Sequence, residues 1–192
     1  MSDYRKELRK TKIHARDSLS SEERQQLSAL ISERVATSEL YKKAKTVLIY
    51  RATRGEVRLE NLEEAKESEG KRLAFPLCIS NSDMIALLPD GDNAWESGYC
   101  GIMEPIREKS VEIPPTEIDL VICPCTVFDE KCGRMGMGAG FYDRYIEKCV
   151  NADIVAVAFE VQKAEYIPME PWDKPMEAVF TEEAVYVKET TE

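Results

Sequence analysis

Histidine is almost missing from this sequence, because its 192 residues include a single one, His14. His14 stands in a basic segment without an evident acidic or nucleophilic partner, so we expect it at the surface. A Ser-His-Asp triad and other histidine-based acid–base chemistry are therefore disfavoured. Any catalytic activity must depend on other side chains.

Long apolar runs and an excess of positive charge are also missing. No segment approaches the ~20 apolar residues that a membrane-spanning helix needs, and the first residues lack the apolar core of a secretory signal. We therefore expect a cytoplasmic protein with no membrane partner. The formal net charge of −10 argues against general nucleic-acid binding, which needs a basic surface. It does not exclude a basic pocket for a small anionic ligand.

Paired cysteine motifs are the third absence. Among the six cysteines, Cys123 and Cys125 form a C-x-C pair with Cys132 nearby, whereas structural zinc sites typically show paired C-x2-C spacings. Disulfides are rare in the cytoplasm. We therefore interpret the cysteines as free thiols, several of them buried.

The segments that are present alternate between helical and strand-like patterns. Helices are expected over 3–17, from a capping box at Ser20 and Glu23 to about residue 40, and from Leu59 to near Gly70. Strands are expected near 46–50, 72–75 with a stop at Pro76, 84–88, 120–123, 153–159 and 178–187. This order predicts a three-layer α/β/α fold with a mostly parallel sheet.

The chain is predicted to form one domain over 1–192, most simply as a monomer. Residues 90–117 are rich in glycine, proline and acids and show little periodicity. We interpret them as an excursion or small flap over the sheet.

Residues 128–145 carry the densest chemistry in the sequence. A strand-like run precedes them, and their second half has helical spacing, so they predict the order strand, glycine-rich turn, helix. Gly136, Gly138 and Gly140 leave the turn without β-carbons, so its amides can approach a ligand. A helix N-terminus after such a turn suits a phosphate. The spacing is neither a dinucleotide fingerprint nor a Walker loop.

Charged residues accompany this turn. Arg134 could contact phosphate in a bidentate manner, and Asp143 could hold Mg²⁺ or merely satisfy the helix dipole. Arg5 and Arg9 share one helix face, either as a solvated surface or as a pair of cations for polyphosphate. Tyr142 could lie against a flat ring or pack in the core.

Together with Phe128 and Asp129, residues 133–145 resemble the signature of the 5-formyltetrahydrofolate cyclo-ligases, also called 5,10-methenyltetrahydrofolate synthetases. Further matches follow in the family's order, so the resemblance covers nearly the whole chain. These matches are Arg5, Arg9, Glu56, 101–105, 158–162, Pro168, Asp173 and 181–182.

The resemblance implies a fold similar to ribose-phosphate isomerase and CoA-transferase domains. It also implies an ATP- and Mg²⁺-dependent reaction on 5-formyltetrahydrofolate. The formyl oxygen would be phosphorylated, and N10 of the folate would then displace phosphate to give the 5,10-methenyl bridge, ADP and phosphate. Such a reaction needs placement and charge neutralisation rather than a protein nucleophile.

The resemblance also implies roles for individual residues. Arg134 and Tyr142 would be catalytic, and Asp143 and Asp173 would bind the metal. Arg51, Glu56 and Tyr142 would contact the folate, with the Glu56 oxygens accepting N–H groups of the pterin. The nucleotide would be bound by Arg5, Arg9, Arg134, Met135, Gly136, Met137, Gly138, Ala139, Gly140, Phe141 and Tyr142.

Two alternatives stay open, and positions that depart from the family pattern motivate the first of them. Leu59, Leu77 and Trp172 replace residues that are commonly polar in the family. They motivate the alternative of a non-catalytic nucleotide- or folate-binding module on the same fold. A sugar-phosphate isomerase or CoA transferase, with Glu56 as base or nucleophile, is the other alternative, although the motif at 134–145 is not theirs.

Overall fold

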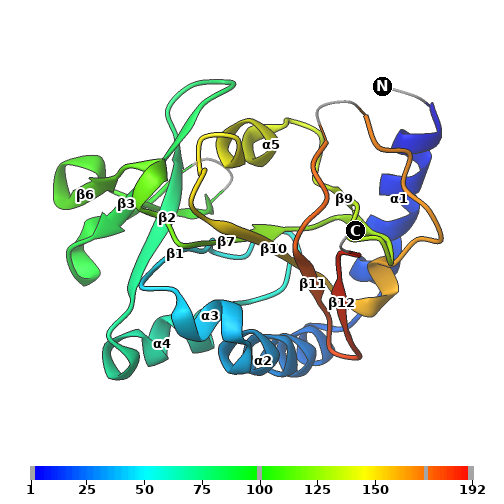
Figure 1. Cartoon of the computed structure of the whole chain (residues 1–192), viewed down its shortest axis with the longest axis horizontal. Helices are drawn as coiled ribbons and strands as arrows, with labels where there is room; N and C mark the ends of the chain where they lie inside the picture. Colours follow the sequence, from blue (N-terminus) through cyan, green and yellow to red (C-terminus); the bar gives the residue numbers. More distant parts are fainter. Residues whose placement is uncertain (1–2, 99–100, 171–172, 190–192) are drawn as a thin grey trace.

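An eight-stranded sheet runs through the middle of the molecule, with helices on both of its faces (Figure 1). The structure is a computed structural model that describes residues 3–98, 101–170 and 173–189. The strand order is β12-β11-β10-β7-β1-β2-β3-β6. The strands are β1 (Thr46–Leu48), β2 (Arg72–Cys78), β3 (Met84–Pro89), β6 (Ser110–Ile113), β7 (Leu120–Pro124), β10 (Asp153–Val157), β11 (Ala178–Phe180) and β12 (Val185–Val187).

The centre of the sheet is parallel and its margins are antiparallel. Strands β11, β10, β7, β1 and β2 pair in parallel, whereas β12, β3 and β6 pair antiparallel. The register places Val47 opposite Leu73 on one side and Leu120 on the other. The carboxyl ends of the parallel strands therefore meet at one edge, where ligands of such sheets bind. The predicted α/β class and mostly parallel sheet are confirmed.

Helices α2 (Ser21–Thr37), α3 (Glu39–Lys43) and α4 (Glu60–Glu69) lie along one face, and α5 (Phe141–Ile146) lies on the other (Figure 1). The predicted capping box begins α2, because the Ser20 hydroxyl accepts from the Glu23 amide at 3.1 Å and the Glu23 carboxylate accepts from the Ser20 amide at 2.7 Å. Helix α1 (Asp3–Asp17) matches its predicted range and lies beside η5 (Glu160–Gln162). No helix among the described residues is both long and apolar enough to cross a membrane.

Alternate side chains of the central strands pack into two separate hydrophobic clusters, one on each face of the sheet. Val47 and Ile122 pack with the helices of one face, whereas Leu48 and Val121 pack with α5 on the other. Successive strand side chains point to opposite faces, and strands buried on both faces are apolar throughout. This explains why the central strands read as continuous apolar runs, and it accounts for the three layers.

Strand β2 continues through Pro76, so the predicted stop at that proline is wrong. Hydrogen bonds from the Arg72 amide to the Lys45 carbonyl and from the Ile49 amide to the Ala74 carbonyl show that even-numbered residues of β2 face β1. Pro76 is the next residue on that side, and it lies past the end of β1. Its missing N–H therefore costs no ladder hydrogen bond.

The predicted excursion at 90–117 contains a small hairpin and one strand of the main sheet. The strands β4 (Trp95–Ser97) and β5 (Met103–Pro105) pair with each other, between the 3-10 turns η1 (Asp92–Ala94) and η3 (Arg107–Lys109). Strand β6 then joins the sheet beside β3, before the turn η4 (Pro115–Glu117). The sequence did not predict β6, because only Ile113 in this edge strand is buried.

Candidate active site

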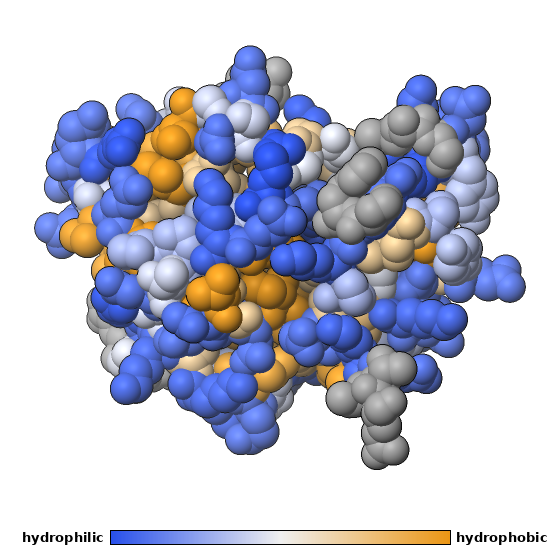
Figure 2. All heavy atoms as spheres, turned by 45° about the horizontal axis from the view of Figure 1, so that its top comes forward, coloured by the Kyte–Doolittle hydropathy of each residue, from blue (hydrophilic) through white to orange (hydrophobic). Residues whose placement is uncertain are grey.

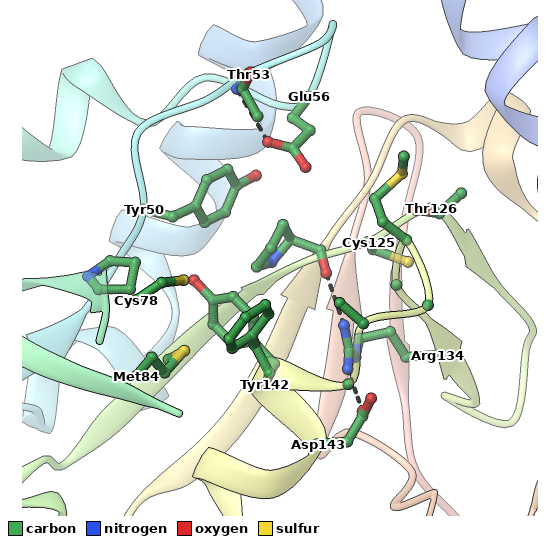
Figure 3. A pocket seen from close by; sticks show the side chains of 18 of the residues that line it. Tyr50, Thr53, Glu56, Cys78, Met84, Cys125, Thr126, Arg134, Tyr142 and Asp143 are labelled. Carbon is green, nitrogen blue, oxygen red and sulfur yellow. Dashed lines mark hydrogen bonds and ion pairs between the residues drawn. The ribbon is translucent and has the colours of Figure 1, made fainter. Parts of the chain in front are cut away.

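A cavity of about 860 Å³ opens where β1, β2 and β7 end. The last residue of β2, Cys78, and the segments that follow β1 and β7, with Tyr50 and Thr126, contribute to its wall (Figure 3). Its volume is in the range of small-molecule and cofactor sites. The structure brings all the predicted site residues to this one cavity: Arg5, Arg9, Arg51, Glu56, Arg134, Met135, Gly136, Met137, Gly138, Ala139, Gly140, Phe141, Tyr142, Asp143 and Asp173.

A short hairpin, β8 (Val127–Phe128) with β9 (Arg134–Met135), separates β7 from the glycine-rich turn. The buried carboxylate of Asp129 closes it. One oxygen accepts from the amides of Gly133 at 2.9 Å and Lys131 at 3.1 Å, and the other accepts from the amide of Ile167 at 2.9 Å. A β-carbon on Gly133 would come within 3.0 Å of this carboxylate. Asp129 and Gly133 of the signature are thus structural residues.

The glycine-rich turn requires its glycines for two reasons. Gly138 and Gly140 have φ angles of 107° and 72°, which residues with side chains rarely adopt. A β-carbon on Gly140 would also lie 2.7 Å from a guanidinium nitrogen of Arg144. That arginine donates to the carbonyls of Ser82 at 2.8 Å and Ala139 at 2.9 Å. It thereby ties the turn to the loop between β2 and β3.

Helix α5 is only six residues long, which revises the predicted phosphate site at its N-terminus. A helix of less than two turns has few aligned peptide dipoles. The positive charge around the turn comes instead from the guanidinium groups of Arg5, Arg9, Arg134 and Arg144, all of which line the cavity.

Arg134 is held in place by two partners. It is buried at the base of the turn, and its Nη1 donates to the Pro124 carbonyl at 3.0 Å, while Nη2 pairs with Asp143 at 2.5 Å (Figure 3). Its Nε is buried without a hydrogen-bond partner within the described parts of the chain. The guanidinium is therefore fixed beside the glycine-rich turn by protein contacts alone.

Arg5 and Arg9 form the buried face of α1, so the solvated-surface alternative is wrong for this pair. They are 5% and 9% exposed. Arg5 donates to the Pro168 carbonyl at 2.9 Å and pairs with Asp173 at 2.5 Å, and Arg9 donates to the Gly136 carbonyl at 2.8 Å. Burial first, and then the neighbouring Arg5, lower the pKa of Arg9. His14, as predicted, is exposed on the same helix.

The two predicted metal ligands each have an arginine partner. Asp143 pairs with Arg134 and Asp173 with Arg5. Residues 3–98, 101–170 and 173–189 contain no group of three or more histidine, cysteine or acidic side chains suited to a metal. Magnesium usually takes one or two protein carboxylates together with substrate phosphates and water. Two carboxylates in an arginine-lined cavity fit that donor set only when a polyphosphate completes it.

The described cysteines form no alternative metal site. The described cysteines are free, and Cys100 lies outside the described residues. Burial raises the pKa of both Cys123 and Cys125 to about 12, so these two thiols are neutral near pH 7. Neutral thiols are poor metal ligands and poor nucleophiles. The interpretation of buried free thiols is thus consistent with their surroundings.

Glu56 lies on the opposite wall from the glycine-rich turn (Figure 3). One carboxylate oxygen accepts from the Thr53 amide at 3.0 Å, and the other lies on the cavity side. Burial raises the pKa of Glu56, an effect that the Thr53 amide and then Arg16 and Arg54 oppose. Arg16, buried in α1, also donates to the Arg54 carbonyl at 2.5 Å and holds this loop.

Arg51 is held by partners that the sequence did not identify. Its Cζ lies 3.6 Å from the centre of the Trp95 ring in the β4–β5 hairpin, and its Nη2 pairs with Glu63 at 3.0 Å. Trp95 meets Phe75 edge-on, with ring centres 4.8 Å apart. Because these partners are far apart in sequence, no local pattern could indicate them. Leu59, one of the departures from the family pattern, is buried in the core, and Trp172 lies outside the described residues.

Tyr142 offers an unused hydroxyl. Its oxygen is buried and has no hydrogen-bond partner among the residues that the structure describes. Burial raises its pKa well above the ordinary value, so the hydroxyl is neutral and able to donate. Figure 3 shows the ring below Tyr50, with its hydroxyl directed towards Cys78 and away from Arg134. A hydroxyl in this place suits a polar group of a ligand.

The fold is that of an α/β protein, and its cavity at the carboxyl ends of the parallel strands is lined by arginines, carboxylates and a glycine-rich turn. The molecular surface in Figure 2 is mostly hydrophilic, with smaller hydrophobic patches between the charged side chains. The sequence matches the 5-formyltetrahydrofolate cyclo-ligase family over residues 1–182, and the chain belongs to that family. The resemblance of its signature is thereby confirmed.

Curated relatives and solved structures support this assignment along almost the full chain. The 5-formyltetrahydrofolate cyclo-ligase of Escherichia coli K12 is 29% identical over 175 residues, which cover 89% of this chain and 96% of that protein. The mouse enzyme of the same name is 28% identical over 182 residues, covering 86% and 87%. The 5,10-methenyltetrahydrofolate synthetase of Aquifex aeolicus superposes with a TM-score of 0.85 at 32% identity, covering 97% and 94%. The Mycoplasma pneumoniae synthetase has the same fold, with a TM-score of 0.75 at 23% identity, covering 92% and 98%.

Proposed function

We propose that this protein converts 5-formyltetrahydrofolate to 5,10-methenyltetrahydrofolate in the cavity described above, with ATP as co-substrate and Mg²⁺ as the metal. The observation that carries the proposal is the division of one cavity into two sides. Arg9 and Arg134 lie at the glycine-rich turn on one side, Arg5 pairs with Asp173 in the same cavity lining, and Glu56 lies on the other side. A phosphate donor and a heterocyclic acceptor could therefore meet in the same space.

The nucleotide would lie against the glycine-rich turn. Arg9 and Arg134 are anchored to the turn and to β7 by backbone carbonyls, so their charges are placed before a ligand binds. Charge-assisted bonds from such groups to phosphate are stronger than neutral ones. Asp143 and Asp173 would hold Mg²⁺, which would neutralise phosphate charge when bound.

The folate would lie on the side of Glu56. The free oxygen of this carboxylate can accept N–H donors of the pterin ring. Arg51, stacked on Trp95, adds a cation at the same wall. The Tyr142 hydroxyl, which has no hydrogen-bond partner among the described residues, would donate to the formyl or pterin group. A mixture of aromatic surface and a few oriented polar groups is typical of sites for small molecules.

The chemistry explains why the cavity needs cations rather than a nucleophile. The formyl group is an amide, which is a poor electrophile with a poor leaving group. Transfer of the γ-phosphoryl group to the formyl oxygen releases ADP and makes that oxygen a good leaving group. Attack by N10 on the formyl carbon, with loss of the N10 proton and of phosphate, closes the ring. Arg134 would stabilise the charge on the phosphoryl oxygens during the first step.

The decisive experiment is a spectroscopic assay of methenyl product from 5-formyltetrahydrofolate. We expect turnover only when both ATP and Mg²⁺ are present. Calorimetry with each ligand should accompany the assay. Binding of both ligands without product would instead indicate a non-catalytic module, and isomerase or transferase activity without ATP would indicate the third alternative.

We predict that folate binding depends on pH through the ionisation of the Glu56 carboxylate. The ionised carboxylate accepts more hydrogen bonds than the protonated acid, and burial raises the pKa of Glu56. We therefore expect the KM for 5-formyltetrahydrofolate to rise as the pH falls from about 8 towards this raised pKa. In Glu56→Gln the KM should be higher near neutral pH and nearly independent of pH.

The matched control for this prediction is Glu64→Gln, because Glu64 lies exposed on the nearby helix α4. It should retain the KM and the pH profile of the unmodified protein. A Glu56→Gln variant with an unchanged KM profile would remove Glu56 from the folate site.

A further inference from the structure

A buried side-chain amide, that of Gln162, lies behind the candidate active site and outside the cavity lining. It ends the turn η5, which follows β10, and it is 1% exposed. Its oxygen accepts from the Phe159 amide at 2.9 Å, which orients the group. Its Nε2 donates to the carbonyls of Cys125 at 2.8 Å and Thr126 at 3.0 Å.

These two carbonyls belong to the turn that carries the chain from β7 into the β8–β9 hairpin. The carbonyl that precedes them, that of Pro124, accepts Nη1 of Arg134 at 3.0 Å. The Thr126 amide donates to the carbonyl of Met135, the residue after Arg134, at 2.9 Å. The turn thus contacts the guanidinium of Arg134 and the backbone of the residue that follows it.

We propose that Gln162 is a positioning residue for Arg134, acting through the turn at Pro124, Cys125 and Thr126. The inference rests on the catalytic role proposed above for Arg134. Gln162 would contact no substrate. Its two donated hydrogen bonds hold the turn so that the Pro124 carbonyl and the Met135 backbone keep the guanidinium at the glycine-rich turn.

This role requires a hydrogen-bond donor at the end of the side chain of residue 162. A side chain without Nε2 would leave two buried carbonyls unpaired and allow the turn to shift. A carboxyl group of the same shape would behave differently in its two protonation states. When protonated it can donate to one carbonyl, and when ionised it faces two carbonyl oxygens with a negative charge. Burial and these dipoles would raise the pKa of such a carboxyl.

The first test is Gln162→Glu, assayed for turnover between about pH 8 and about pH 6, where a carboxyl with a raised pKa gains its proton. We expect kcat to be at least ~10-fold below that of the unmodified protein at the higher pH. The ratio of the kcat of Gln162→Glu to the kcat of the unmodified protein, measured at the same pH, should rise towards one as the pH falls. A ratio that is independent of pH would overturn the proposal, because a merely structural defect does not regain a donor.

The second test uses Gln162→Met and does not depend on the carboxyl variant folding well. We expect this variant to lower kcat with little change in the Kd for ATP, and to cause no further loss in an Arg134→Ala background. Equal losses in both backgrounds would contradict a role through Arg134. An unchanged kcat in Gln162→Met would also overturn the inference.

The matched control is Lys71→Met. Lys71 donates to the carbonyls of Tyr41 and Ala44, both at 2.7 Å, beside α3 and outside the cavity lining. We expect it to lower stability without changing kcat below its unfolding temperature. The unmodified protein is assayed alongside, and if it shows no turnover, the proposed function itself fails rather than the role of Gln162.

Discussion

Arg134→Ala is expected to lower kcat by about 10²–10³-fold, which is the typical cost of removing one preorganised group that stabilises transition-state charge. The buried guanidinium lies at the glycine-rich turn, fixed by the Pro124 carbonyl and Asp143. The charge on the transferring phosphoryl group develops during the reaction. Loss of the Arg134 guanidinium should therefore affect kcat more than the Kd for ATP. Turnover by methenyl absorbance and ATP binding by calorimetry measure the two effects.

Two further variants sharpen this test. Arg134→Lys keeps the charge but cannot contact the Pro124 carbonyl and Asp143 in the same planar geometry, so we expect only partial activity. Arg107→Ala, which removes an exposed arginine paired with Glu112 in the excursion, should behave like the unmodified protein. Full activity in Arg134→Ala would exclude this arginine from the mechanism.

Asp129→Ala is expected to lower the free energy of unfolding by about 3 kcal/mol or more. Its carboxylate accepts from the amides of Lys131, Gly133 and Ile167. Each buried donor that loses its partner costs about 1–3 kcal/mol. Urea unfolding monitored by circular dichroism measures the change.

The comparison variants for this prediction are Asp129→Asn and Asp92→Ala. Asparagine keeps one acceptor oxygen but places an NH₂ group against a backbone donor, so we expect an intermediate loss of stability. Asp92 is exposed at η1, and its replacement should change stability by less than about 0.5 kcal/mol. A small effect in Asp129→Ala would mean that water replaces the carboxylate in the hairpin turn.

Local patterns in the sequence were sufficient for the fold class and for most elements. The capping box at Ser20 and Glu23 and the basic helix at 3–17 have short-range causes, and both occur in the structure. The apolar runs of the parallel strands are equally visible, because burial on both faces makes every residue apolar. The signature at 128–145 and the matches elsewhere in the chain identified the family and the expected site residues, whose roles stay predictions until they are tested.

Features that depend on neighbours in space could not be predicted in this way. Pro76 lies within a strand only because β1 ends before reaching it, and β6 has too few buried side chains to show a period. The hairpin β8–β9 consists of two-residue strands closed by Asp129. None of these has a periodic pattern in the sequence.

The sequence by itself determined the family, the order of most helices and strands, and the types of residue available for the proposed recognition of phosphate and pterin. These properties depend on composition, periodicity and a contiguous signature. Only the tertiary structure decided that Arg9 is buried against the glycine-rich turn and Arg5 against Pro168 and Asp173. It also decided that Trp95 holds Arg51 and that Gln162 contacts the turn beside Arg134. The physical reason is that hydrogen bonds and ring contacts join residues far apart in the chain, and their geometry arises only when the sheet assembles.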